Sequence, residues 1–167
     1  MSGSTENRTS GAFEKSRGPS ATFTWPAAQR MLPLVRRIVA DLLHHRQHLA
    51  RMNAEKGHLD RNRRSLDWPA RSRRYQLQEE IAAADGDLKA SLTELEGLGV
   101  VLVDREAGQV GFPTFVNDRP ACFSWRPGEE GLRYWHFADD AARHEIPVSW
   151  TRAEPRRRGA SRSEPRP

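Results

Sequence analysis

The fold is decided by the stretch Leu88-Lys-Ala-Ser-Leu-Thr-Glu-Leu-Glu-Gly-Leu-Gly-Val-Val-Leu-Val103, in which the spacing of the apolar residues changes. Before Gly99, leucines recur every three or four residues, which is the spacing of one face of an α-helix. From Val100 to Arg105 the pattern has the period of two that is typical of a β-strand. Gly97 and Gly99 mark the end of the helix, because glycine is common just after the last helical turn. The chain is therefore predicted to divide into a helical part and a β part.

Two helices are predicted before this change of period. The first begins at Thr24-Trp-Pro-Ala27, where a proline in the first turn costs no hydrogen bond. Pro33 falls inside the helix, so regular helix is predicted either to begin after Pro33 or to kink there. Arg46 interrupts the apolar stripe of this helix. The stripe consists of Leu32, Val35, Val39, Leu42 and Leu49.

The second helix begins at Asp67-Trp-Pro-Ala70, where Asp67 is a helix-capping residue. A connection near residues 57–66 predicts an antiparallel helical hairpin over residues 24–98. Residues 23–64 carry nine basic and three acidic groups, whereas residues 75–98 carry six acidic groups and one lysine, so pairing would neutralise both. The second stripe is close to the heptad spacing of a coiled coil and consists of Leu77, Ile81, Ala84, Leu88, Leu92, Leu95 and Leu98.

The β part is predicted to be a four-stranded antiparallel meander over residues 100–137, with a tight turn at Asn117-Asp118. Such a sheet must cover one of its faces, and the helical hairpin is the available cover. Pro113 predicts that its strand lies at an edge or is bulged there. The predicted fold class is α+β, in a single domain over residues 23–150 whose last part, 138–150, is an extension. The predicted strands are 100–105, 109–116, 120–125 and 132–137.

Composition assigns the remaining residues to tails. Residues 1–22 and 151–167 have few large apolar groups and are predicted to be disordered. The net charge of +5 belongs to these tails, because residues 23–150 hold eighteen charges of each sign. A basic chain is therefore only a weak indication of nucleic-acid binding here. No apolar run is long enough to span a membrane, no secretory signal is present, and Cys122 has no second cysteine to pair with, which together favour the cytoplasm.

The best candidate for a site is the stretch from Cys122 to His136, which brings aromatic and ionisable residues together around one Pro-Gly turn. A hairpin here could place Glu129 or Glu130 near His136. A carboxylate beside a histidine could form an acid–base pair or half of a metal site. The alternatives are a binding surface, or core aromatic residues with Glu129 as a loop residue paired with an arginine. The candidate binding residues are Trp125, Arg126, Glu129, Tyr134, Trp135 and His136.

Several motifs in the β part resemble those of the bacterial family designated domain of unknown function 2203. They are Gly111-Phe-Pro113, Cys122-x-x-Trp125-x-x-Gly128-Glu129 and Tyr134-Trp-His136, and the resemblance extends from about Phe23 to Val148. It implies a small protein with a helical and a β part, without an established activity, cofactor or set of functional residues. Gly111 stands where an Asp commonly precedes Phe-Pro, and 139–144 replaces a Gly-rich stretch.

Binding rather than catalysis is the favoured function, for a small cytoplasmic interaction or regulatory protein. A homodimer through the exposed side of the hairpin is predicted from the near-heptad stripes. One alternative is an enzyme or metal-binding protein that uses Glu129 and His136. Another is nucleic-acid binding through the tails and the arginines around Trp68, because arginine and an exposed aromatic residue can contact phosphate and stack on a base. No cofactor or reaction is identified. The candidate nucleic-acid contacts are Arg71, Arg73 and Arg74.

Overall fold

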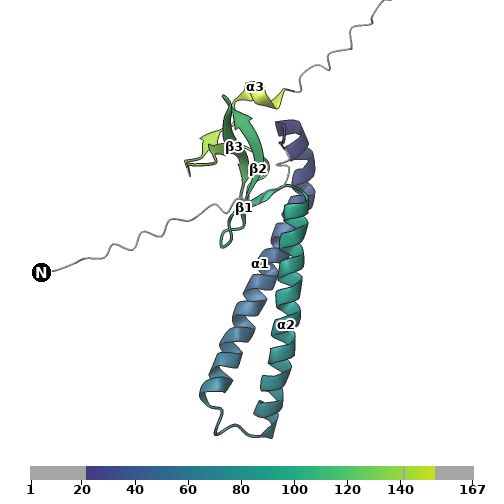
Figure 1. Ribbon diagram of the computed structural model, residues 1–167, viewed down its shortest axis with the longest axis vertical. Helices are drawn as coiled ribbons and strands as arrows, with labels where there is room; N and C mark the ends of the chain where they lie inside the picture. Colours follow the sequence, from purple (N-terminus) through teal and green to yellow (C-terminus); the bar gives the residue numbers. More distant parts are fainter. Residues whose placement is uncertain (1–21, 141, 153–167) are drawn as a thin grey trace, which may run out of the picture.

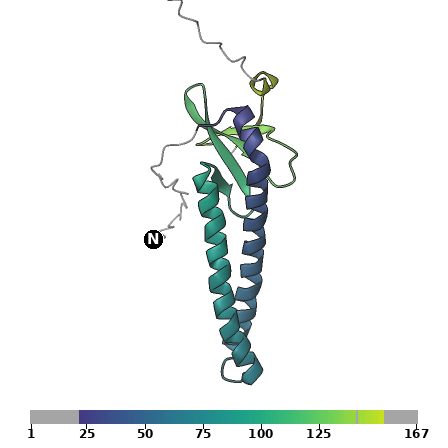
Figure 2. The same cartoon turned by 90° about the vertical axis from the view of Figure 1, so that its right-hand side faces the viewer.

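The structure is a computed structural model that describes residues 22–140 and 142–152. Most of the two predicted tails, 1–22 and 151–167, therefore lies outside the described residues. Two long antiparallel helices, α1 (Trp25–Arg61) and α2 (Trp68–Gly97), form a hairpin, and an antiparallel sheet packs against one end of it. The far half of the hairpin projects away from the sheet (Figures 1 and 2). This arrangement confirms the predicted α+β fold class.

Helix α1 begins at Trp25, with Pro26 in its first turn, and runs without interruption through Pro33 to Arg61. The expectation that regular helix could begin only after Pro33 is wrong. A proline inside a helix removes one hydrogen-bond donor and crowds the carbonyl four residues earlier. Buried Leu32 and Val35 flank Pro33 and pack in the core, and this packing holds the helix together there. In α2 the predicted cap forms, with the Asp67 carboxylate accepting a hydrogen bond from the Ala70 amide at 3.0 Å.

The apolar stripes of the two helices face each other and the sheet. In the half near the sheet, α1 residues such as Val35 and Val39 share one core with strand residues. In the far half, a separate small cluster is buried between the helices alone. A two-helix hairpin buries only a narrow seam, and the far half depends on that seam. The buried members of this second cluster are Met52, Leu77 and Ala84.

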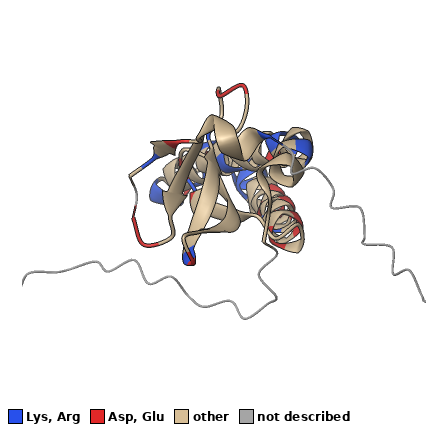
Figure 3. Ribbon diagram, turned by 90° about the horizontal axis from the view of Figure 1, so that it is seen from above, with Lys and Arg blue, Asp and Glu red and all other residues tan. Residues whose placement is uncertain are grey.

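Ion pairs also join the two helices, but they are not the pairs between basic residues of α1 and acidic residues of α2 that the sequence predicts. Basic residues predominate over 23–64 and acidic residues over 75–98. Figure 3 looks down the hairpin and shows both kinds of charge on the helices. The ion pairs between the helices nevertheless use arginines of α2 and carboxylates of α1. Arg73 pairs with Glu55 at 2.8 Å, and Arg74 pairs with Asp60. The two pairs lie at the far end of the hairpin.

The sheet has five strands rather than four, in the order β1-β2-β3-β4-β5, and each strand pairs antiparallel with the next. The added strand comes from the segment that was predicted as an extension. Asn117 and Asp118 both have positive φ, at 51° and 59°, which confirms the tight turn between β2 and β3. The strands are β1 (Val101–Asp104), β2 (Gln109–Val116), β3 (Arg119–Trp125), β4 (Tyr134–Phe137) and β5 (His144–Glu145).

Strand β2 lies between β1 and β3, so the expectation of an edge strand at Pro113 holds only locally. Strand β1 pairs with β2 no further than Gly111, and Pro113 lies beyond that point. There the Pro113 carbonyl accepts a hydrogen bond from the Phe23 amide at 2.7 Å instead of from a strand. The missing N–H of proline therefore breaks no ladder bond between strands.

The last described segment returns to the sheet and ends in the single-turn helix α3 (Val148–Thr151). Trp150 of α3 packs against Trp135, with ring centroids 5.4 Å apart, and against Phe123 at 6.5 Å. Thr151, which was assigned to the disordered tail, belongs to this helix. Strand β5 extends the sheet at its edge, and α3 covers a part of the inner face, the face that also packs on α1. Figure 1 shows α3 beside the end of the sheet. None of the described helices is long and apolar enough to cross a lipid bilayer.

Candidate functional site

The carboxylate of Glu129 is bound on all sides by groups of its own chain. Arg143 donates two hydrogen bonds to it, from Nη1 to Oε1 at 2.7 Å and from Nη2 to Oε2 at 2.9 Å. The Arg126 amide donates a third, at 2.9 Å. The side chains of Arg143 and Glu129 are only 13% and 21% exposed. A paired guanidinium and carboxylate with this geometry is among the strongest polar contacts in proteins, so it fixes the loop 126–133 between β3 and β4.

Arg143 makes two further contacts. Its guanidinium lies 4.4 Å from the centre of the Tyr134 ring, and its Nη2 donates to the Ser124 carbonyl at 3.3 Å. One arginine thus joins the loop, the end of β3 and the start of β4. Arg143 directly precedes His144, the first residue of β5, so the pairing of β5 with β4 positions it.

Trp125 and Arg36 hold the same loop from the side of α1. The Trp125 indole is buried and donates from Nε1 to the Glu129 carbonyl at 3.0 Å. Arg36 lies 5.6 Å from the Trp125 ring and donates from Nη2 to the carbonyls of Glu129, at 2.9 Å, and Glu130. Gly128 has a φ of +95°, which allows the turn between them. The loop is therefore held to both the sheet and the helix.

Arg126 is exposed and joins a polar row, buried at its other two members, on the outer face of the sheet, the face turned away from α1. Its Nε donates to Gln109 Oε1 at 2.8 Å, and Gln109 Nε2 donates to Ser124 Oγ at 3.0 Å. Gln109 and Ser124 are both buried. Each of these buried polar groups has a partner, so the row stabilises the end of the sheet rather than leaving a polar group to receive a ligand.

Burial alone would raise the pKa of Glu129. The hydrogen bonds from Arg143 and the Arg126 amide, together with the charges of both arginines, have a larger combined effect and lower the pKa below its usual value. Glu129 is therefore ionised at neutral pH and acts as an acceptor. A general acid needs the opposite, a raised pKa that keeps its proton. The environment of Glu129 is that of a structural ion pair.

This lowered pKa predicts that the protein loses stability in acid. Glu129 contributes its full stabilisation above the pKa of an unfolded glutamate, about 4.3, and loses it as the pH falls through the lower folded value. Urea unfolding between about pH 6 and pH 3 measures the loss. In Glu129→Gln the fall of unfolding free energy over this range should be shallower than in the unmodified chain. Equal slopes would contradict the assignment.

His136 is 5% exposed and does not meet Glu129. Its Nδ1 lies 2.7 Å from the Phe137 carbonyl, and because a carbonyl only accepts, Nδ1 carries the proton. Nε2 is buried without a hydrogen-bond partner. His136 pairs across the sheet with Cys122, on the face that also holds Tyr134. No hydrogen bond or ion pair between described residues joins Glu129 to His136, so the predicted acid–base pair is not formed.

The remaining candidates of this segment are packed rather than open. Trp135 lies on the inner face, 4.9 Å from Phe137 and 5.0 Å from His144 between ring centroids. Burial raises the pKa of the Cys122 thiol to about 11, which keeps it protonated. In the part of the chain that the structure describes, no three His, Cys, Asp or Glu side chains lie close enough to hold a metal ion.

Four residues of the quoted motifs therefore act at one place, where Trp125, Gly128 and Glu129 build the loop and Tyr134 supports its arginine. The sequence profile of a family of uncharacterized conserved proteins, DUF2203, matches residues 21–146, which is most of the chain. The chain belongs to this family. Comparisons of this DUF2203 protein with curated proteins and with solved structures gave no significant match. The expected resemblance is thus confirmed, and the matched region ends just before α3.

At the far end of the hairpin, this DUF2203 protein pairs two of the three arginines proposed to contact nucleic acid. Arg73 binds Glu55 and also Glu80 at 3.0 Å, and Arg74 binds Asp60. Arg71 donates from Nε to the Leu66 carbonyl at 2.9 Å. Three further arginines of this end form no ion pair with any described residue. They are Arg61, Arg63 and Arg64.

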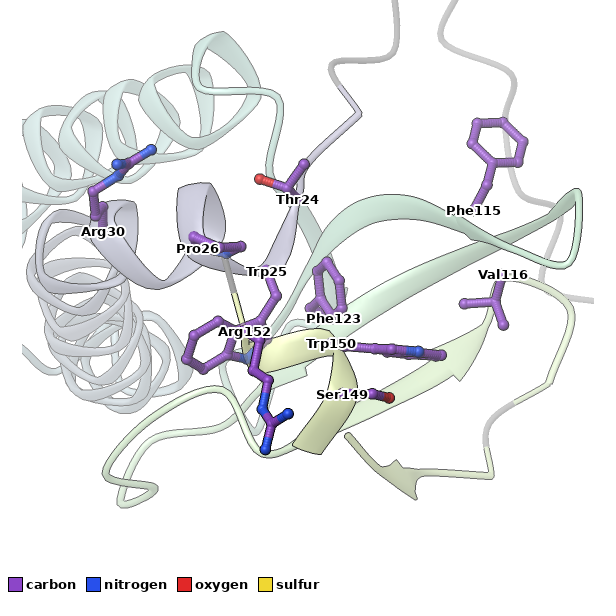
Figure 4. Close-up of a pocket in the computed structure, with 10 residues that line it drawn as sticks. All are labelled: Thr24, Trp25, Pro26, Arg30, Phe115, Val116, Phe123, Ser149, Trp150 and Arg152. Carbon is purple, nitrogen blue, oxygen red and sulfur yellow. The ribbon is translucent and has the colours of Figure 1, made fainter. Parts of the chain in front are cut away.

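Two aromatic side chains at this end are largely exposed. Trp68 is 78% exposed and Tyr75 is 63% exposed, whereas the other four tryptophans are at least partly buried. Two hollows lie elsewhere. One, of about 590 Å³, lies between α1 and the loop 126–133, and the other, of about 690 Å³, lies between the start of α1, the sheet and α3 (Figure 4).

Sequence reasoning missed Arg36 and Arg143, the two residues that hold the loop 126–133. For Arg36 a usable indication existed, because it lies directly beside the buried stripe of α1, next to Val35 and one turn before Val39. Arg143 gave a weaker one, as the single arginine in the acidic segment 139–145. Neither sequence position indicates that the arginine contacts Glu129 or its loop.

Proposed function

We propose that this protein is a small bacterial interaction module that acts in the cytoplasm by binding a protein partner through the far end of its helical hairpin. The observation that carries the proposal is the exposure of Trp68, at 78%. Tryptophan, tyrosine and arginine are the residue types that dominate binding energy at protein interfaces. All three gather at this end. We call this the tip surface, defined by Trp68, Tyr75, Arg61, Arg63, Arg64 and Arg71.

The geometry of α2 supports a single contact face. Trp68 and Tyr75 are seven residues apart, which is two helical turns, so their side chains lie on the same side of α2 about 10 Å apart. Leu77 and Ala84 of the same helix face the seam with α1. The aromatic pair is therefore on a face that the hairpin does not need for its own packing. The sheet is at the other end of the molecule (Figure 2) and cannot cover it.

Charge indicates the chemistry of the partner. Four arginines of the tip surface form no ion pair among the described residues, and Asp67 is engaged as the helix cap. A partner that offers an acidic surface around an apolar recess for Trp68 would complement both features. A nucleic acid is less well supported, because Arg73 and Arg74 are already neutralised by Glu55, Glu80 and Asp60.

The other two hypotheses have less support. A homodimer was predicted through apolar stripes, yet those stripes pack within the hairpin and against the sheet. Two copies of the tip surface would oppose arginine to arginine, which is unfavourable. Catalysis or metal binding by Glu129 and His136 would need an available carboxylate near the imidazole. Glu129 is instead held by Arg143, and His136 bonds to the Phe137 carbonyl.

The proposal predicts a protein partner whose binding depends on the tip surface. The tagged full-length chain and the variant Trp68→Ala/Tyr75→Ala are to be purified from the same cells, with nuclease treatment, and the co-purifying proteins compared. At least one acidic protein should be retained by the unmodified chain and lost from the variant. With that protein purified, the double variant should weaken binding at least 30-fold, because each hot-spot side chain contributes roughly tenfold or more.

Phe115→Ala is the matched control, since Phe115 is a similarly exposed aromatic residue at the other end of the molecule. It should leave binding unchanged. Raising the salt concentration should weaken binding, because the arginine contacts are screened. A co-purifying set that is identical in the tip variant, or that disappears with nuclease treatment, would contradict the proposal, and the second result would favour nucleic acid.

A further inference from the structure

Both α1 and the single turn of α3 cover the inner face of the sheet, α1 over one part of it and α3 over another. A hollow remains between the two helices (Figure 4). Its volume of about 690 Å³ is within the range of small-molecule sites, about 300–1,000 Å³. We call it the head pocket. It is lined by Thr24, Trp25, Pro26, Arg30, Phe115, Val116, Phe123, Ser149, Trp150 and Arg152.

The walls of the head pocket are aromatic and held in place. Trp25 is fixed by a hydrogen bond from its Nε1 to the Leu132 carbonyl at 3.1 Å. Trp150 packs on Trp135 and Phe123, with centroid distances of 5.4 and 6.5 Å. Figure 4 shows Trp25, Phe123 and Trp150 near one another in the lining of the pocket, with Val116 on the side of the sheet. Flat apolar groups bind well between such rings.

The charge of the head pocket has one sign. Its lining holds two arginines, Arg30 and Arg152, and no carboxylate. Neither arginine makes a hydrogen bond or ion pair with any residue of 22–140 or 142–152. The hydroxyl groups of Thr24 and Ser149 add polar atoms to the lining. Two guanidinium groups that have no ion-pair partner among the described residues lie along an apolar wall and attract an anion, and a guanidinium binds a carboxylate through paired hydrogen bonds.

We infer that the head pocket binds a small organic anion with a flat apolar body, of the class of aromatic carboxylic acids. The body lies among Trp25, Phe123 and Trp150, and the carboxylate pairs with Arg30 or Arg152. This site is separate from the tip surface, at the other end of the molecule, and does not depend on the protein partner proposed for it.

The test uses the full-length chain and two probes of equal shape, naphthalene-1-acetate and its neutral amide, naphthalene-1-acetamide. Binding is followed by NMR through the indole N–H signals of the five tryptophans, assigned by single Trp→Phe variants. The acid should shift the signals of Trp25 and Trp150 and leave that of Trp68 in place. It should bind at least threefold more tightly than the amide, because only the acid pairs with an arginine.

Arginine variants separate the charge from the apolar walls. At least one of Arg30→Ala and Arg152→Ala should weaken binding of the acid about two- to fivefold, as for a partly exposed ion pair, and neither should change binding of the amide. Arg51→Ala is the matched control, since it removes the same charge from the hairpin outside the head pocket. The inference is overturned if neither probe shifts Trp25 and Trp150, if the acid and the amide bind equally, or if Arg51→Ala has the same effect as the two lining variants.

Discussion

Replacing Arg143 by alanine should lower the free energy of unfolding by about 2–3 kcal/mol. The change leaves the Glu129 carboxylate, which is 21% exposed, without the guanidinium that neutralises it. It also removes the contacts of Arg143 with the Tyr134 ring and the Ser124 carbonyl. Removing one partner of a fully buried ion pair costs roughly 3–5 kcal/mol, and partial exposure of this pair reduces that cost. Urea unfolding at pH 7 measures the difference.

Arg133→Ala provides the matched control. Arg133 is also an arginine near the same loop, and it pairs with Glu130 at 3.1 Å, but the two side chains are 68% and 88% exposed. Such surface pairs contribute about 0–1 kcal/mol, so this variant should unfold almost as the unmodified chain does. Equal effects of the two substitutions would show that the Glu129–Arg143 pair has no special structural role.

Phe112→Ala should have a larger effect, a loss of about 3–5 kcal/mol, because it empties a fully buried site. Phe112 lies in β2 on the face toward α1 and contacts Phe23 edge to face, with ring centroids 5.5 Å apart. It therefore joins the sheet, the helix and the start of the domain. Thermal or urea unfolding measures the change.

Phe115→Ala is the control for this second substitution, in the same strand and with the same loss of volume. Phe115 is 59% exposed, so its removal should change the unfolding free energy by less than about 0.5 kcal/mol. A small effect of Phe112→Ala would contradict the packing of the sheet against α1.

The main elements could be predicted because each has a long local pattern. The leucine spacing before Gly99 fixes α2, and Asp67 caps it as its sequence position indicates. Asn117 and Asp118 adopt the positive φ values that a two-residue turn requires. In these segments local preference and tertiary packing agree, so the sequence is sufficient.

The elements that were missed are short or depend on distant contacts. Strand β5 has two residues and α3 has four, too few for a period of two or 3.6 to appear. Their positions follow from Trp150, which packs on Trp135 and Phe123 across the sheet. Of the two alternatives at Pro33, a helix that begins only after it is wrong, because the packing of Leu32 and Val35 outweighs a local preference against proline.

The candidate site was predicted in part. Among the alternatives, Glu129 as a loop residue paired with an arginine is the one that the structure shows, with Arg143 as the partner. The proposed contact between Glu129 and His136 is not formed, because the Glu129 carboxylate binds Arg143 instead. The chain contains 24 arginines, and no local pattern distinguishes the one that reaches Glu129. Such partners are chosen by the tertiary fold, over a separation of fourteen residues here.

The motif residues of this DUF2203 protein thus have a structural explanation that does not require a reaction. Trp125 and Glu129 fix the loop, and Arg36 joins it to α1. The tip surface and the head pocket instead combine aromatic side chains with arginines that form no ion pair with any described residue. Binding is therefore proposed at those two places and not at the motif.

The most direct test of this account is a double-mutant cycle on the unfolding free energy with Glu129→Gln, Arg143→Ala and the double variant. If the pair is the structural link described, the two substitutions should be coupled by at least about 1 kcal/mol, with the double variant less destabilised than the sum of the singles. Strictly additive effects would show that Glu129 and Arg143 act independently, and would contradict the structural role assigned to the motif.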